Sequence, residues 1–185
     1  MSDTKKYSAM LRGINVGGHH KIPMADLRIE FTKLGFTNVS TLLNSGNVLF
    51  DTTSGSAEKI EIKIEKRLQD VFGFSVPVIL RDAFEIQDII DLDPFKKIKL
   101  THDLRFYVSF LKEEFKINFK LPHISKDRSF RIINTNKNNV FSVLDLTLGK
   151  TTKGMEELEK LFGKELTTRN WNTVIKIFEL QKSNL

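Results

Sequence analysis

Residues 39–50, VSTLLNSGNVLF, are predicted to form the hairpin around which the first half of the chain is organised. Two runs of β-branched and apolar residues, 39–43 and 48–50, flank the tetrapeptide Asn44-Ser45-Gly46-Asn47. Asparagine and glycine tolerate positive φ angles, which tight hairpin turns require. We therefore expect two antiparallel strands joined by a short turn.

A strand and a helix are predicted on each side of this hairpin. Upstream, residues 7–11 have strand composition, and Pro23 then begins a helix that Gly35 ends. Downstream, apolar residues recur at three- and four-residue steps in a second helix, which Gly73 ends before a strand at 76–80. The predicted order of elements is β-α-β-β-α-β.

This order is the split βαβ pattern of ferredoxin-like domains, in which two helices cover one face of a four-stranded antiparallel sheet. Pro77 agrees with it, because a proline cannot donate a ladder hydrogen bond and belongs on an edge strand. Residues 76–80 are therefore expected at a sheet edge, beside residues 7–11. The predicted fold class is α+β.

The second half of the chain contains fewer clear signals. The predicted elements are a helix at 83–92, a strand at 104–111, a hairpin of 130–134 with 140–146, a helix ended by Gly163 and a last helix at about 171–180.

Residues 113–121 leave two interpretations open. Phe115, Ile117, Phe119 and Leu121 alternate as in a strand, whereas a repeat of the first half would place a helix here. The order of the other elements resembles that of the first half and predicts a diverged duplication. We expect a ferredoxin-like half at 1–82 and a second α+β half, with an extra C-terminal helix, at 83–185.

Composition excludes several classes of protein. The 185-residue chain contains no cysteine, which excludes disulfides, thiolate zinc sites and cysteine nucleophiles. Residues 1–6 lead into no long apolar region, and no apolar run is long enough to cross a bilayer. We therefore expect a cytoplasmic protein without a signal peptide or a membrane partner.

The net charge of +6 and the isoelectric point near 9.4 favour anionic partners. The 29 Lys and Arg residues are nevertheless mixed with 23 acidic residues and form no basic block. A solvated basic surface is therefore favoured over a groove for nucleic acid.

The loop LRGINVGG, residues 11–18, is the first candidate site. Its glycines expose backbone N–H groups, and Arg12 and Lys21 supply cations, as in an anion-binding loop. It matches neither the Walker nor the dinucleotide glycine pattern. The alternative is a plain strand-to-helix crossover whose glycines adopt positive φ.

Two further polar segments could complete an anion site. The turn at 44–47 would contribute only if it folded beside the first loop, and the segment 167–173 combines a candidate helix cap, at Thr168 or Asn170, with Arg169 and Asn172. Trp171 is expected to anchor the last helix in the core. The predicted ligand-binding residues are Arg12, Gly13, Asn15, Gly17, Gly18, Lys21, Ser45, Asn47, Thr168, Arg169, Asn170 and Asn172.

These three motifs, LRGINVGG followed by Lys21, then SGNV at 45–48, and finally TRNWNTV at 168–174, resemble those of the DUF1697 family of bacterial proteins. The resemblance spans nearly the whole chain. It implies a small cytosolic α+β protein. Because the family has no known function, the resemblance brings no substrate or mechanism.

The residues name no reaction. Ser45 has no identifiable histidine base, and no pair of carboxylates stands at an informative spacing, so no catalytic residue or cofactor is predicted. His19 and His20 are adjacent and are expected at the surface, without a metal. The favoured function is binding an anionic small molecule, such as a nucleotide or phosphorylated metabolite. A nucleic-acid-binding module and a phosphotransfer or hydrolytic enzyme stay open as alternatives, and so does the oligomeric state.

Overall fold

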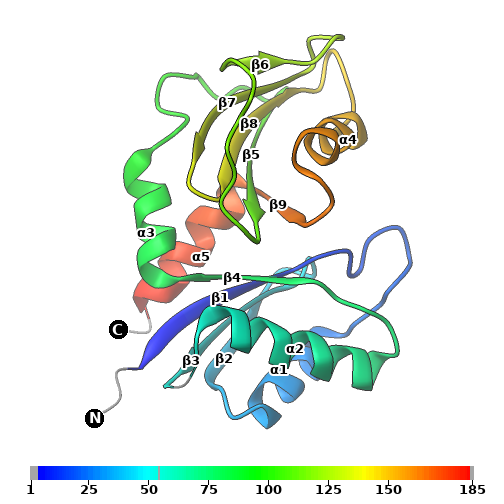
Figure 1. Ribbon diagram of the computed structural model, residues 1–185, viewed down its shortest axis with the longest axis vertical. Coiled ribbons are helices and arrows are strands. Elements are labelled where there is room, and N and C mark those ends of the chain that lie inside the picture. The colour runs from blue at the N-terminus through cyan, green and yellow to red at the C-terminus, as the bar shows by residue number, and fades with distance from the viewer. Residues whose placement is uncertain (1–3, 54, 184–185) are drawn as a thin grey trace. The chain divides into compact units, whose positions relative to one another are not determined.

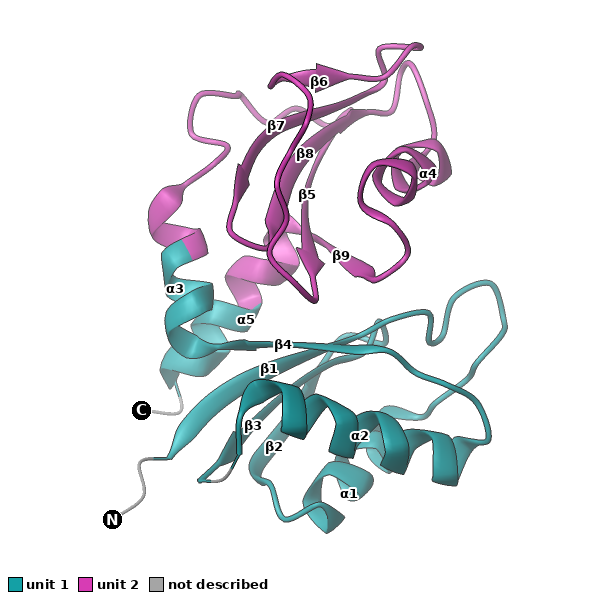
Figure 2. Cartoon of the chain, viewed as in Figure 1, with its two compact units in different colours: residues 1–88, 177–185 teal, residues 89–176 magenta. Residues whose placement is uncertain are grey.

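A computed structural model describes residues 4–53 and 55–183; residues 1–3, on which the expectation of no signal peptide partly rests, lie outside this part. In the described residues the protein is an α+β fold with two antiparallel sheets and five helices (Figure 1). The chain divides into two compact units, residues 1–88 with 177–185 and residues 89–176 (Figure 2). None of the described helices is long and apolar enough to cross a membrane.

The first unit has the predicted order of elements. These are β1 (Lys5–Leu11), α1 (Met24–Lys33), β2 (Thr37–Leu42), β3 (Asn47–Thr52), α2 (Ala57–Phe72) and β4 (Val78–Asp82). The strands form an antiparallel sheet in the order β2-β3-β1-β4, and α1 and α2 lie on one face of it (Figure 1). Ferredoxin-like remains our interpretation of this topology.

The edge position of the fourth strand is confirmed. In the described residues β4 pairs with β1 alone, from Tyr7 opposite Asp82 to Leu11 opposite Val78. The ladder begins at Val78 rather than at Val76, because Pro77 has no N–H to donate. The Pro77 carbonyl still accepts a 2.9 Å hydrogen bond from the Arg12 N–H.

The core of the first unit lies between the sheet and its two helices. Alternate residues of β1, Tyr7, Ala9 and Leu11, are buried there, as the two-residue period of a strand requires. Phe31 of α1 and Phe50 of β3 meet edge to face, with ring centroids 5.5 Å apart. Leu11, at the other end of β1, belongs to the same core, which fixes the strand end from which the candidate loop departs.

The second unit contains a five-stranded sheet. Its elements are β5 (Leu104–Leu111), β6 (His123–Ile124), β7 (Phe130–Asn136), β8 (Asn139–Asp145), α4 (Thr151–Phe162) and β9 (Leu166–Asn170), while α3 (Ala83–Leu92) and α5 (Trp171–Ser183) contribute to both units (Figure 2). The strand order is β6-β7-β8-β5-β9, so without β6 it repeats the order of the first sheet. This repetition supports the predicted duplication.

Residues 113–121 form neither of the two elements considered for them. The segment contains no helix or strand, although its side chains do alternate between half-buried and exposed. Phe115 and Phe119 contact Phe162 of α4, with centroid distances of 4.8 and 6.0 Å. The segment therefore packs its apolar side chains on the core without a partner strand in the described residues.

One feature of the second half differs from the predictions. Residues 166–170 form the strand β9, paired with β5 from Leu111 opposite Leu166 to Tyr107 opposite Asn170, where a helix cap and ligand contacts were predicted but no strand. The compact units divide α3 and α5 between them. Compact units are defined by contacts and not by independent folding, so the boundary at residue 82 stays a prediction.

Candidate functional site

The glycine loop contains a tight turn. Gly17 and Gly18 have φ angles of 61° and 81°, and the His19 N–H donates to the Val16 carbonyl at 3.2 Å. Two consecutive positive φ angles are typical of a two-residue turn and explain why glycines stand here. The local chain path thus accounts for both glycines without a ligand.

Asn15 closes the base of this loop. Its side-chain oxygen accepts from the Ile22 N–H at 2.9 Å, and its amide nitrogen donates to the Ile22 carbonyl at 3.0 Å. The same nitrogen donates to the Asn44 carbonyl at 2.9 Å. Asn15 therefore joins both ends of the loop to the β2–β3 turn, which is a structural role that the sequence did not reveal.

The turn at 44–47 lies beside the glycine loop, as required for it to share a site. The Leu11 N–H donates to the Gly46 carbonyl at 2.8 Å. A Cβ on Gly46 would lie 2.7 Å from Ile14 Cδ1 and 2.9 Å from Leu11 Cβ, so the turn packs directly on the loop. The two motifs thus lie side by side, although they are 29 residues apart at Asn15 and Asn44.

Two predicted residues of this turn serve its own structure. Asn47 is fully buried and donates to the Leu42 carbonyl at 2.9 Å and to Ser45 Oγ at 3.1 Å. Ser45 is exposed, and its hydroxyl supports Asn47. Both residues shape the turn and do not line the hollow described next.

A hollow of about 390 Å³ opens where the loop meets α1. It is lined by Asn15, Gly18, Lys21, Ile22, Pro23, Met24 and Asn44. Pro23 is the N-cap of α1, and in the described residues no side chain caps this helix start. The positive end of the helix dipole and its first N–H groups are therefore available beside the exposed ammonium of Lys21.

Arg12 and Gly13 stand outside this hollow. Arg12 is half-buried at the end of β1, where its backbone is bonded to Pro77, and Gly13 is exposed with a φ of 73°. Of the two predicted cations, the lining includes Lys21 alone. The lining is completed by four residues that were not predicted, Ile22, Pro23, Met24 and Asn44. Pro23 before a helical pattern was a usable signal of a helix start without a side-chain cap.

The C-terminal motif contributes a buried arginine. Arg169 is 7% exposed in β9, and its Nη1 donates to Thr167 Oγ1 at 2.7 Å and to the Thr168 carbonyl at 3.0 Å. Burial lowers the pKa of its guanidinium to about 10. The Thr168 hydroxyl is bonded to Ser109 Oγ at 2.8 Å. These contacts support the sheet, and Arg169 does not offer a surface cation to a ligand.

The end of the same motif begins α5. Asn170 Oδ1 accepts from the Asn172 N–H at 3.0 Å, so Asn170 is the cap and the alternative cap Thr168 is excluded. Trp171 contacts Phe95 at a centroid distance of 5.3 Å, in agreement with its predicted anchoring role. Asn170 and Asn172 also line a hollow of about 160 Å³ in the second unit, together with Arg105.

The aromatic residues considered for base stacking are engaged inside the protein. Phe106 is buried and stacks on Phe95 at 4.6 Å, and Phe110 is fully buried. His20, next to the glycine loop, stacks on Phe74 at 4.3 Å. The phenylalanines at 106–119 therefore form core contacts and leave no exposed stacking platform in this segment.

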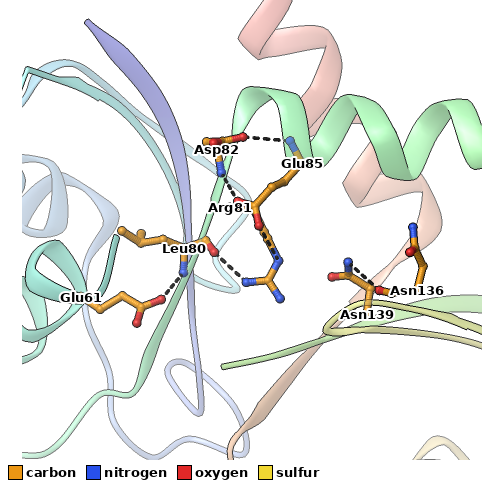
Figure 3. Close-up of polar contacts among 7 residues, drawn as sticks. All are labelled: Glu61, Leu80, Arg81, Asp82, Glu85, Asn136 and Asn139. Carbon is orange, nitrogen blue, oxygen red and sulfur yellow. Dashed lines mark hydrogen bonds and ion pairs between the residues drawn. The ribbon is translucent and has the colours of Figure 1, made fainter. Parts of the chain in front are cut away.

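Polar contacts hold β4 to its neighbouring helices (Figure 3). The buried carboxylate of Glu61 accepts from the Leu80 N–H at 2.8 Å, and Arg81 Nη1 donates to the Leu80 carbonyl at 2.8 Å. Asp82 and Glu85 exchange two 2.8 Å hydrogen bonds between side chain and backbone, which is a capping box at the start of α3. Figure 3 also shows the 3.2 Å bond from Asn139 to the Asn136 carbonyl within the β7–β8 turn.

Comparison with known proteins agrees with the motifs of the first half. The family described as a protein of unknown function, DUF1697, matches residues 4–141. The chain belongs to the DUF1697 family. The matched residues include the glycine loop and the β2–β3 turn, whereas the C-terminal motif lies beyond them.

A solved structure shares the fold. The conserved bacterial protein SP0830 from Streptococcus pneumoniae is 24% identical to this chain, with a TM-score of 0.74. The alignment covers 96% of this chain and 98% of that protein. The comparison with curated proteins finds no match. Membership of DUF1697 and the α+β fold are thus established, and neither names a ligand.

Proposed function

We propose that this DUF1697 protein binds an anionic small molecule, such as a nucleotide or a phosphorylated metabolite, in the hollow between the glycine loop and α1. The observation that carries the proposal is the start of α1, where Pro23 provides no side-chain cap. Helix N-termini bind anions because their first N–H groups are unpaired and their dipole is positive.

The lining of the hollow favours a negative ligand, while the exposed Asp26 in the first turn of α1 offsets part of the helix dipole. Lys21 lines the hollow and is exposed. Asn44 adds an amide group, whereas Asn15 uses both side-chain N–H groups and its oxygen in the three hydrogen bonds that fix the loop to the turn. The hollow thus combines a cation, a helix start and a loop that hydrogen bonds hold in place, a combination suited to a phosphate or carboxylate group.

The size of the hollow limits the ligand class. Its volume of about 390 Å³ falls within the usual range for small-molecule sites, about 300–1,000 Å³. Net charge alone would also favour a polyanion, but the basic residues are dispersed along the chain. Arg12 lies outside the lining and is not part of the proposed site.

A thermal-shift screen tests the proposal. Nucleotides, sugar phosphates and short oligonucleotides are added separately to the purified protein, since a ligand that binds only the folded state raises its melting temperature. Lys21→Gln should reduce the shift caused by a phosphorylated small molecule, while the exposed Lys66→Gln on α2 serves as a charge-matched control.

The outcomes separate the alternative functions. A small-molecule shift that Lys21→Gln abolishes and Lys66→Gln preserves supports the proposed site. An affinity for oligonucleotides that falls with salt at a log–log slope of several units would instead support nucleic-acid binding and contradict the proposal. Equal melting-temperature shifts in the Lys21→Gln and Lys66→Gln variants would show that the ligand does not bind at Lys21 or in the hollow that Lys21 lines.

A further inference from the structure

A second hollow in the first unit has a different chemical character. Its volume is about 780 Å³, and its walls come from the start of β1, the first turns of α3 and the end of α5. The lining side chains that matter here are Lys5, Lys6, Phe84, Gln87, Phe178 and Lys182. All of them belong to the first unit, which is teal in Figure 2.

Two aromatic rings line this hollow. Phe84 is 82% exposed, more than any other large apolar side chain in the described residues. It lies within the capping box, between Asp82 and Glu85, whose two hydrogen bonds fix the first turn of α3. The backbone therefore holds Phe84 at the hollow while the ring itself remains uncovered.

Cations accompany the rings. Lys182 Nζ lies 4.5 Å from the ring centroid of Phe178, and Lys6 Nζ donates to the Gln181 carbonyl at 3.3 Å. Lys5 adds a third, exposed ammonium group. The carboxylate of Asp82 also lines the hollow, but it accepts the Glu85 N–H at the positive end of α3, which offsets its charge.

The wall formed by α5 is firmly attached to the sheet. Gln181 is 6% exposed, and its Nε2 donates to Ser8 Oγ of β1 at 2.9 Å. In the described residues its Oε1 has no hydrogen-bond partner. The helix end and the strand start are thus held together, so the hollow has a preformed shape.

We propose that this hollow is a binding site for a small aromatic anion, meaning a planar ring that carries a negative group. The ring stacks on Phe84, and the negative group lies among Lys5, Lys6 and Lys182. Its volume of about 780 Å³ suits a molecule of nucleotide size. This site uses none of the residues of the hollow at α1 and does not depend on the function proposed for that hollow.

Fluorescence titration with 8-anilinonaphthalene-1-sulfonate tests the proposal, because this probe is an aromatic anion whose emission rises in an apolar site. Phe84→Ala should weaken its binding about tenfold, by analogy with the loss of one base–aromatic stack. The melting temperature of the Phe84→Ala variant should equal that of the wild type, since the Phe84 side chain is 82% exposed. Ile62→Ala, at an apolar residue that is 55% exposed on α2, is the matched control and should bind the probe as the wild type does.

The charged partner is tested separately. Lys182→Gln should weaken the binding of the probe severalfold, whereas Lys66→Gln should leave its affinity unchanged. The proposal is overturned if the wild-type protein does not bind the probe, or if Phe84→Ala and Ile62→Ala bind it equally well. It is also overturned if a short oligonucleotide displaces the probe with a log–log salt slope of several units, because the surface would then be a nucleic-acid groove.

Discussion

Replacing Gly46 by alanine tests whether the β2–β3 turn supports the glycine loop as described. The new Cβ would lie 2.7 Å from Ile14 Cδ1 and 2.9 Å from Leu11 Cβ. The Ile14 methyl can rotate away, but the Leu11 Cβ moves only with its backbone. Because the Leu11 N–H donates to the Gly46 carbonyl, such a movement also strains this 2.8 Å hydrogen bond.

The expected loss has two parts. A φ angle of 74° costs an alanine about 1–2 kcal/mol, and a forced overlap in a packed region costs about 1–3 kcal/mol more. Gly17→Ala is the matched control, since its φ is 61° and a Cβ there would meet nothing within 4 Å. Gly46→Ala should therefore be less stable than Gly17→Ala by about 1–3 kcal/mol.

Thermal unfolding followed by far-ultraviolet circular dichroism measures the difference. For a chain of this size, 1 kcal/mol corresponds to about 2–4 °C, so Gly46→Ala should melt about 2–12 °C below Gly17→Ala. Equal melting temperatures for the two variants would show that the turn does not pack on the loop. The shared site of these two motifs would then lose its structural basis.

Two further predictions concern buried charges. Hydrogen bonds from Lys33 and Arg67 lower the pKa of Glu30 below its usual 4.5, so this carboxylate stabilises the fold above about pH 4.5, and that contribution disappears as the pH falls through its lower folded value. Glu30→Gln should lower the free energy of unfolding by about 1.5–3 kcal/mol at pH 7. Urea denaturation over a series of pH values should show a smaller loss of stability at acid pH for this variant than for the wild type, and an equal loss would contradict this assignment. Arg169→Ala should lower stability by about 1–3 kcal/mol, because Thr167 and Thr168 lose a donor, yet leave the affinity for a phosphorylated small molecule within about twofold. If calorimetry shows a large loss of affinity without a loss of stability, Arg169 contacts the ligand and this prediction is wrong.

The first half of the fold was predictable because its signals are local. Pro23, Gly35 and Gly73 mark helix ends, and the apolar residues between them follow the helical period. Pro77 even indicated the edge strand. In these segments the local sequence pattern and the tertiary packing favour the same element, so the pattern alone predicts the element that the fold contains.

The strand β9 was missed because its sequence, LTTRN, is polar and joins α5 without a turn. Arg169 suggests a ligand contact by its chemistry, whereas its burial beside Thr167 depends on pairing with β5, more than fifty residues away. At residues 113–121 the alternation was real, but its cause was packing against Phe162 rather than strand pairing. Both segments are defined by contacts that a local pattern does not contain.

The candidate site was predictable only in part. Gly18, Asn15 and Lys21 were identified from the loop, but the sequence did not show that Asn15 would be consumed in closing the loop, or that Arg12 would stand outside the hollow. Asn44 enters the hollow through a contact across 29 residues. Such long-range contacts are decided by the fold, and the fold has to be known before they can be assigned.

Amide chemical-shift mapping tests the central claim most directly. In a titration of the ¹⁵N-labelled protein with adenosine monophosphate or a sugar phosphate, binding at the start of α1 should shift most strongly the amides of Gly18, Lys21, Met24 and Ala25. The Lys21→Gln variant should require a higher ligand concentration for the same shifts. Saturable shifts confined to other parts of the protein, such as Asn172 at the start of α5, or no shifts with any phosphorylated ligand, would contradict anion binding at the glycine loop.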